Sequence, residues 1–122
     1  MADLLQEFGE TIAQNVPGFL ALSIMEIRNG ICYYSKSANK NYDIDLGASF
    51  ILEMVRAKLN GINALQQQQK IEDITITLTS QFHIVNVSEQ NEYLIYLAVD
   101  ATIANLTMTK ALLNKHKKMI HK

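Results

Sequence analysis

Apolar positions in residues 43–65 repeat with the period of an α-helix, but they lie on two sides of it. At 100° per residue, the first set falls on a face about 100° wide. Its members are Ile44, Ala48, Ile51, Leu52, Val55, Leu59 and Ile62. The second set is Leu46, Phe50, Met54, Ala57, Gly61 and Leu65. A surface helix of a small domain needs one apolar face, so this pattern predicts a long helix with a second face that something else must cover.

The first third of the chain reads as a helix followed by a hairpin. Residues 3–15 have helical spacing and stop at Val16-Pro17-Gly18, because the residue before proline avoids the helical region. Residues 19–27 and 31–35 are nearly continuous apolar runs around Asn29-Gly30. Because both residues of an Asn-Gly pair tolerate positive φ, this spacing predicts two antiparallel strands joined by a tight turn.

The second half of the chain predicts three strands and a helix. Residues 73–79 alternate strictly between isoleucine or leucine and threonine, and residues 82–87 alternate more weakly. Residues 93–99 are apolar on both faces, which is typical of a central strand. Asp100 is placed to cap a last helix over residues 101–120.

Together these elements predict a single domain of residues 1–122 with an α/β (α+β) three-layer sandwich. The five strands form one antiparallel sheet. Because two strands are apolar on both sides, helices must cover both faces of the sheet. The long helix is expected on one face and the terminal helices on the other.

Two explanations are open for what covers the second apolar set. A terminal helix of the same chain could cover it, or a second copy could. The terminal helices are needed on the opposite face, so the pattern favours self-association through an isologous pair of long helices. Gly61 would allow close approach of two backbones, or it is only a weak point in the helix. Residues 74–79 have no proline or lysine, so at a sheet edge they could pair with another strand, unless the glutamine tract at 66–69 shields them.

Composition narrows the classes of function. The formal net charge is −1, which argues against a nucleic-acid partner, and no apolar run approaches the roughly 20 residues that span a bilayer. The N-terminus is acidic where a signal peptide would be basic, and the single Cys32 cannot form an internal disulfide. These features predict a cytoplasmic protein without a membrane span.

No sequence motif indicates an enzyme, and we expect no cofactor and no metal. A Gly-rich phosphate loop, Cys-x-x-Cys, His-Glu-x-x-His and Gly-x-Ser-x-Gly are all missing from the sequence. We interpret Cys32 as a small buried hydrophobe and His83 as a structural histidine in a strand. Asp43 and Asp45 lie where acidic residues favour a helix start, and Asp43 is the expected N-cap.

The chain resembles the Roadblock family, named for dynein light chains, from about residue 16 to residue 120. The resemblance lies in "VPGFLALSIMEIRNGICYYS", the long helix, "IEDITITLTSQFHIVNVSEQNEYLIYLAVD" and "ANLTMTKALL". It implies dimers in which central helices pack antiparallel and the third strands join two sheets. In this chain the implied interface is Leu46, Phe50, Met54, Ala57, Gly61 and Leu65 of the helix, with Ile74, Thr75, Ile76, Thr77, Leu78 and Thr79 of the strand. Which apolar face meets the partner stays open.

The resemblance also implies a function. Bacterial and archaeal members are similar to regulators of small Ras-like GTPases, whereas eukaryotic members are dynein subunits or scaffolds. Here "IMEIRNG" replaces the usual valine-rich first strand, and a last helix is present that the shortest dynein light chains lack. We therefore expect a non-enzymatic homodimer that binds a small GTPase and modulates its nucleotide cycle or localisation. The alternative is a structural scaffold or motor-associated light-chain-like subunit, possibly heterodimeric; a small-molecule sensor ranks third.

Overall fold

The order of helices and strands matches the one predicted, in a computed structural model that describes residues 2–120. The elements are α1 (Ala2–Asn15), β1 (Phe19–Glu26), β2 (Cys32–Ser37), α2 (Ile44–Ala64), β3 (Asp73–Thr77), β4 (Gln81–Val87), β5 (Tyr93–Asp100), α3 (Leu106–Lys117) and the 3₁₀ turn η1 (Lys118–Ile120).

The five strands form one antiparallel sheet in the order β2-β1-β5-β4-β3. The central strand β5 pairs with β1 on one side and β4 on the other, so that Tyr96 lies between Ser23 and Val85. Strand β5 is buried from Tyr93 to Val99, as its apolar pattern predicts. The two edges of the sheet are β2 and β3.

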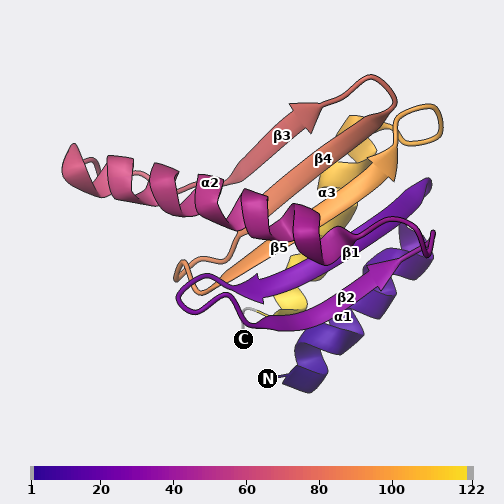
Figure 1. Cartoon of the computed structure of the whole chain (residues 1–122), viewed down its shortest axis with the longest axis horizontal. Helices are drawn as coiled ribbons and strands as arrows, with labels where there is room; N and C mark the ends of the chain where they lie inside the picture. Colours follow the sequence, from indigo (N-terminus) through magenta and orange to yellow (C-terminus); the bar gives the residue numbers. More distant parts are fainter. Residues whose placement is uncertain (1, 121–122) are drawn as a thin grey trace.

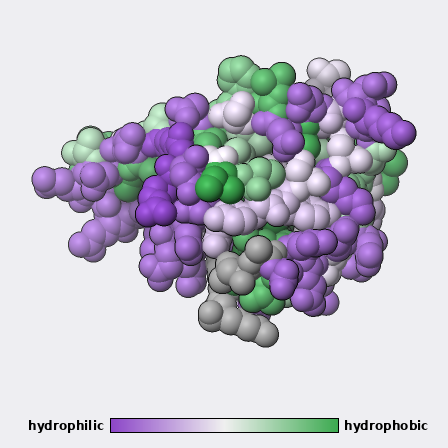
Figure 2. Space-filling model, turned by 60° about the horizontal axis from the view of Figure 1, so that its bottom comes forward, coloured by the Kyte–Doolittle hydropathy of each residue, from purple (hydrophilic) through white to green (hydrophobic). Residues whose placement is uncertain are grey.

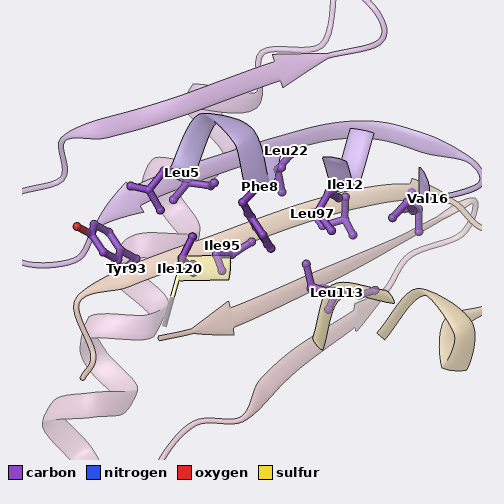
Figure 3. Close-up of a cluster of buried hydrophobic side chains, with 13 residues drawn as sticks. Leu5, Phe8, Ile12, Val16, Leu22, Tyr93, Ile95, Leu97, Leu113 and Ile120 are labelled. Carbon is purple, nitrogen blue, oxygen red and sulfur yellow. The ribbon is translucent and has the colours of Figure 1, made fainter. Parts of the chain in front are cut away.

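Helices cover both faces of the sheet (Figure 1). Helices α1 and α3 lie together on one face, and α2 crosses the other. Figure 3 shows the core under α1, where side chains from α1, β1, β5 and α3 meet. Leu5, Phe8 and Ile12 of α1 are fully buried there. The predicted α+β three-layer sandwich, with the long helix on one face and the terminal helices on the other, is confirmed.

Three predicted boundaries were wrong. The β1–β2 connection is wider than an Asn-Gly turn, since the Gly30 N–H donates to the Glu26 carbonyl and only Gly30 of the pair has positive φ (75°). Strand β3 ends at Thr77, so Leu78 and Thr79 lie in the turn before β4. Helix α3 begins after Asn105, whose side chain accepts from the Met108 N–H at 2.9 Å.

Asp100 does not cap α3 because its carboxylate has nearer donors. It accepts from the Thr102 N–H at 2.9 Å and from the Thr102 hydroxyl at 2.7 Å. These hydrogen bonds lower the pKa of Asp100. The Asp100 side chain therefore stabilises the turn that follows β5. Helix α3 starts at Leu106, five residues after the predicted start at residue 101.

Gly9 allows α1 to lie directly against Tyr34 of β2. A Cβ at Gly9 would overlap the Tyr34 ring, whose hydroxyl donates to Glu10 Oε2 at 3.0 Å. Alanine usually stabilises a helix relative to glycine, by about 1 kcal/mol. We expect Gly9→Ala to have the opposite sign and to lower the free energy of unfolding by about 1–3 kcal/mol, because the ring must move. Chemical denaturation measures this.

Gly47→Ala is the matched control. A Cβ at Gly47 would lie 3.6 Å from Tyr96, which is an ordinary contact distance, and Gly47 is also helical. We expect this variant to be as stable as the wild type or more stable. Equal destabilisation by both substitutions would contradict the role assigned to the Gly9–Tyr34 contact.

Candidate self-association surface

The first apolar set of α2 faces the sheet. Ile44, Ala48, Ile51, Leu52 and Val55 are buried against β1, β2 and β5. The helix begins as predicted, with the Leu46 N–H donating to Asp43 Oδ1 at 3.0 Å. The structure thus settles which of the two faces belongs to the core of this chain.

Arg56 holds the middle of α2 to the β1–β2 connection. Its Nε and Nη2 donate to the Ile27 carbonyl at 2.9 and 2.7 Å, and Nη1 lies 2.8 Å from Glu53. From sequence, Arg56 belongs only to the polar strip of the helix, which consists of Glu53, Arg56, Asn60 and Asn63. No local pattern identifies a backbone carbonyl 29 residues away as its acceptor. This tether adds to the apolar packing of the first set in holding α2 on the sheet.

The second apolar set is exposed. Phe50 is 71% exposed, Leu65 70% and Leu46 58%, and Met54, Ala57 and Gly61 are also exposed. Helices α1 and α3 lie on the opposite face of the sheet, so neither covers this set. Figure 2 shows a cluster of hydrophobic residues at the top of the molecule, with hydrophilic residues beside it. Of the two accounts, cover by a terminal helix of the same chain is excluded.

The last turns of α2 project past the sheet (Figure 1). From Ala57 to Ala64, only Leu59 and Ile62 are half-buried, and the rest are exposed. The helix ends with the N–H groups of Gln66 and Gln67 donating to the carbonyls of Asn63 and Ile62. This projecting end has little support from its own domain, although helices in proteins gain most of their stability from packing.

The edge strand β3 is open to a further strand. The Leu78 N–H donates to the Gln81 carbonyl, and the alternation of an antiparallel ladder then directs the N–H and C=O of Thr75 away from β4. Ile74 and Ile76 are half-buried on the α2 face of the sheet. The glutamine tract is exposed, and the N–H groups of its first two residues bond to α2 and not to β3.

The other edge strand, β2, is protected. Its pairing with β1 shifts register between Ile24 and Met25, and α1 packs beside it. Lys36 lies in the strand and forms an ion pair with Glu10 of α1 at 3.0 Å. Bulges and lysines are the devices that prevent edge strands from pairing. Strand β3 has no bulge and no lysine. The two edges therefore differ as expected if a strand of another copy pairs with β3 and not with β2.

Comparison with solved structures identifies the fold. No protein-family model and no curated protein matches the sequence. MglB from Myxococcus xanthus superposes with a TM-score of 0.83 at 10% identity, covering 98% of this chain and 86% of MglB. A Roadblock/LC7 domain from Streptomyces avermitilis gives 0.77 at 9% identity, covering 95% and 93%. An MglB with a tetrameric arrangement gives 0.71 at 18% identity, covering 93% and 80%.

This chain has the Roadblock/LC7 fold. The fold predicted from the resemblance is therefore confirmed, while the identities of 9–18% carry no information on partners. Within residues 2–120 of this Roadblock/LC7 fold, no helix is both long and apolar enough to cross a membrane. In the same range, no three His, Cys, Asp or Glu side chains are grouped as a metal site would need.

The interpretation of Cys32 as a buried hydrophobe was wrong. Cys32 is exposed at the start of the edge strand β2, which neighbours β1 alone. Its Sγ lies 3.3 Å from the Tyr34 carbonyl and 3.8 Å from both Ser23 Oγ and Asp45 Oδ1. Partial burial of the thiol raises its pKa, with the Asp45 charge acting in the same direction. A raised pKa disfavours the thiolate, which is the reactive form.

His83 is half-buried in β4 and fully engaged by neighbouring side chains. Its Nδ1 lies 3.1 Å from the Tyr96 hydroxyl and its Nε2 lies 2.8 Å from Gln81 Oε1. This agrees with the interpretation of His83 as a structural histidine. Burial lowers the pKa of His83, so its neutral form is favoured in the folded protein.

Proposed function

We propose that this protein is a non-enzymatic homodimer that binds a small Ras-like GTPase and modulates its nucleotide cycle or its localisation. The observation that carries the proposal is the exposed second apolar set of α2, together with the open edge of β3. Bacterial members of the family that the sequence resembles are regulators of such GTPases, and MglB proteins share this fold.

The exposed side chains of the second apolar set would gain stability by leaving water when two copies associate. Burying a Phe, Leu or Met side chain contributes roughly 1.5–3 kcal/mol. Leu46, Phe50 and Leu65 are each more than half exposed in one chain, and Met54 is 37% exposed. A two-fold axis uses each of these side chains twice, so pairing of two α2 helices would bury the exposed side chains of both copies.

The sheet edge makes the arrangement specific. When the β3 strands of two copies pair antiparallel, the two sheets become continuous. The projecting end of each α2 then extends toward the sheet of the other copy, where Ile74 and Ile76 are half-buried. Helix pairing and strand pairing thereby support the same two-fold arrangement.

The proposed interaction with a GTPase is tested by a binding experiment. The purified protein is mixed with each Ras-like GTPase encoded in the same genome, loaded with GDP or with a non-hydrolysable GTP analogue. We expect a complex with one of them that depends on the nucleotide, together with a changed rate of hydrolysis or exchange. A homodimer that binds none of them in either state would contradict the GTPase proposal.

A further inference from the structure

His83 lies on the face of the sheet that the projecting α2 end of a second copy would approach. In the β3–β4 ladder it is directly opposite Ile76, and both side chains are half-buried. Its ring meets the Tyr96 ring edge-on, with 5.3 Å between the ring centres. His83 is therefore a titratable group at the margin of the proposed interface.

The hydrogen bonds of the neutral ring assign its tautomer. Gln81 Oε1 can only accept, so Nε2 carries the proton, and Nδ1 then accepts from the Tyr96 hydroxyl. The Tyr96 hydroxyl lies 3.5 Å from that of Tyr42, which precedes the N-cap of α2. A second proton on His83 requires the Tyr96 hydroxyl to turn and donate toward Tyr42 instead.

The hydrogen bonds and ion pairs of the surrounding elements involve no counter-charge for a protonated ring. From β5 the titratable neighbour is Tyr96, and from the loop before α2 it is Tyr42. The carboxylates of α2 and β3 are engaged elsewhere. Asp43 caps α2, and Asp45 lies beside Cys32. Glu53 pairs with Arg56 at 2.8 Å, and Asp73 pairs with Lys110 at 3.1 Å.

We propose that His83 makes self-association depend on pH, with protonation of its ring weakening the dimer. This inference rests on the proposed homodimer and adds a regulation to it. A second copy would remove more water from the His83 ring and disfavour its charged form further. The dimer then prefers neutral His83 more strongly than the monomer does.

The direction follows from linkage. The pKa of His83 is already below the ordinary value of about 6.5 in the single chain, and it would be lower still in the dimer. Between these two pKa values the monomer binds more protons, so acidification favours the monomer. Two copies of His83 allow up to about a 100-fold change in the dissociation constant per pH unit. We expect the dissociation constant to increase by at least about tenfold across the pH range, below the ordinary pKa of histidine, in which the His83 ring titrates in the monomer.

Sedimentation at several pH values tests this with the full chain. The wild type should dissociate on acidification, while His83→Gln, which retains a neutral hydrogen-bonding side chain, should stay dimeric. His116→Gln is the matched control, because His116 lies in α3 on the opposite face of the sheet, and it should behave as the wild type. Circular dichroism at each pH confirms that the variants remain folded.

An NMR titration of the His83 ring gives a second readout that does not need the His83 variant. Its pKa should be lower in the dimer than in a monomeric Phe50→Glu chain. A wild-type dimer indifferent to pH, a His83→Gln profile equal to that of the wild type, or equal pKa values in the two states would overturn the inference and leave the homodimer standing. A chain that is monomeric at every pH would overturn the homodimer itself.

Discussion

Phe50→Glu converts the protein to a monomer if the second apolar face of α2 is the dimer contact. Phe50 is 71% exposed in the single chain, so a carboxylate at this position stays in water and leaves the fold intact. In the dimer the same substitution removes an apolar contact and places a charge in a desolvated site, once for each copy. We expect the dissociation constant to rise by at least about 1000-fold, measured by sedimentation equilibrium.

Asn60→Glu is the control for this prediction. Asn60 is an exposed residue of the polar strip of α2, so the variant carries the same added charge on the same helix. It should dimerise as the wild type does. If Phe50→Glu remains dimeric with an unchanged dissociation constant, the contact lies elsewhere on the molecule, and the assignment of the second apolar face is wrong.

Thr75→Pro should weaken the dimer by about 10–100-fold while the single chain stays folded. The Thr75 N–H points away from β4, so proline at this position costs no hydrogen bond within the sheet. It does remove a donor from the free edge and places a ring where a second strand would approach. Each lost hydrogen bond contributes about 0.5–1.5 kcal/mol, and the two-fold axis doubles the loss.

Thr75→Val separates the loss of the N–H from the loss of the side chain. Valine retains the N–H and fits a strand at least as well as threonine, so this variant should dimerise normally. Thermal unfolding of both variants at low concentration reports whether the single chain is intact. If the Thr75→Pro variant dimerises as strongly as the wild type, pairing through the β3 edge is excluded and the interface is restricted to the helices.

Much of the fold follows from local pattern. The alternation in residues 73–79 suffices to place a strand with one buried face, and the apolar run in residues 93–99 suffices to place a central strand. The two apolar faces of α2 are also visible by counting positions. Which of the two faces meets the sheet cannot be read in this way, because both sets are apolar and of similar length, and the Arg56 contact with the Ile27 carbonyl joins residues far apart in the sequence.

The errors arise where neighbouring groups compete for one role or where the order of the strands in space decides the outcome. Asp100 and Asn105 are both suitable N-caps, and the nearby Thr102 donors decide that Asp100 stabilises the preceding turn. Cys32 was assigned to the core from its apolar neighbours, but it begins an edge strand and lies exposed. Edge position depends on the order of strands in space, which the run "ICYYS" does not contain.

The central claim is that two copies of this chain associate through α2 and β3. Sedimentation equilibrium of the wild-type protein near pH 7.5, at about 10 μM, tests it most directly. The account predicts a mass of twice 13.8 kDa that falls to 13.8 kDa in Phe50→Glu. A wild-type mass of 13.8 kDa at this concentration would contradict it.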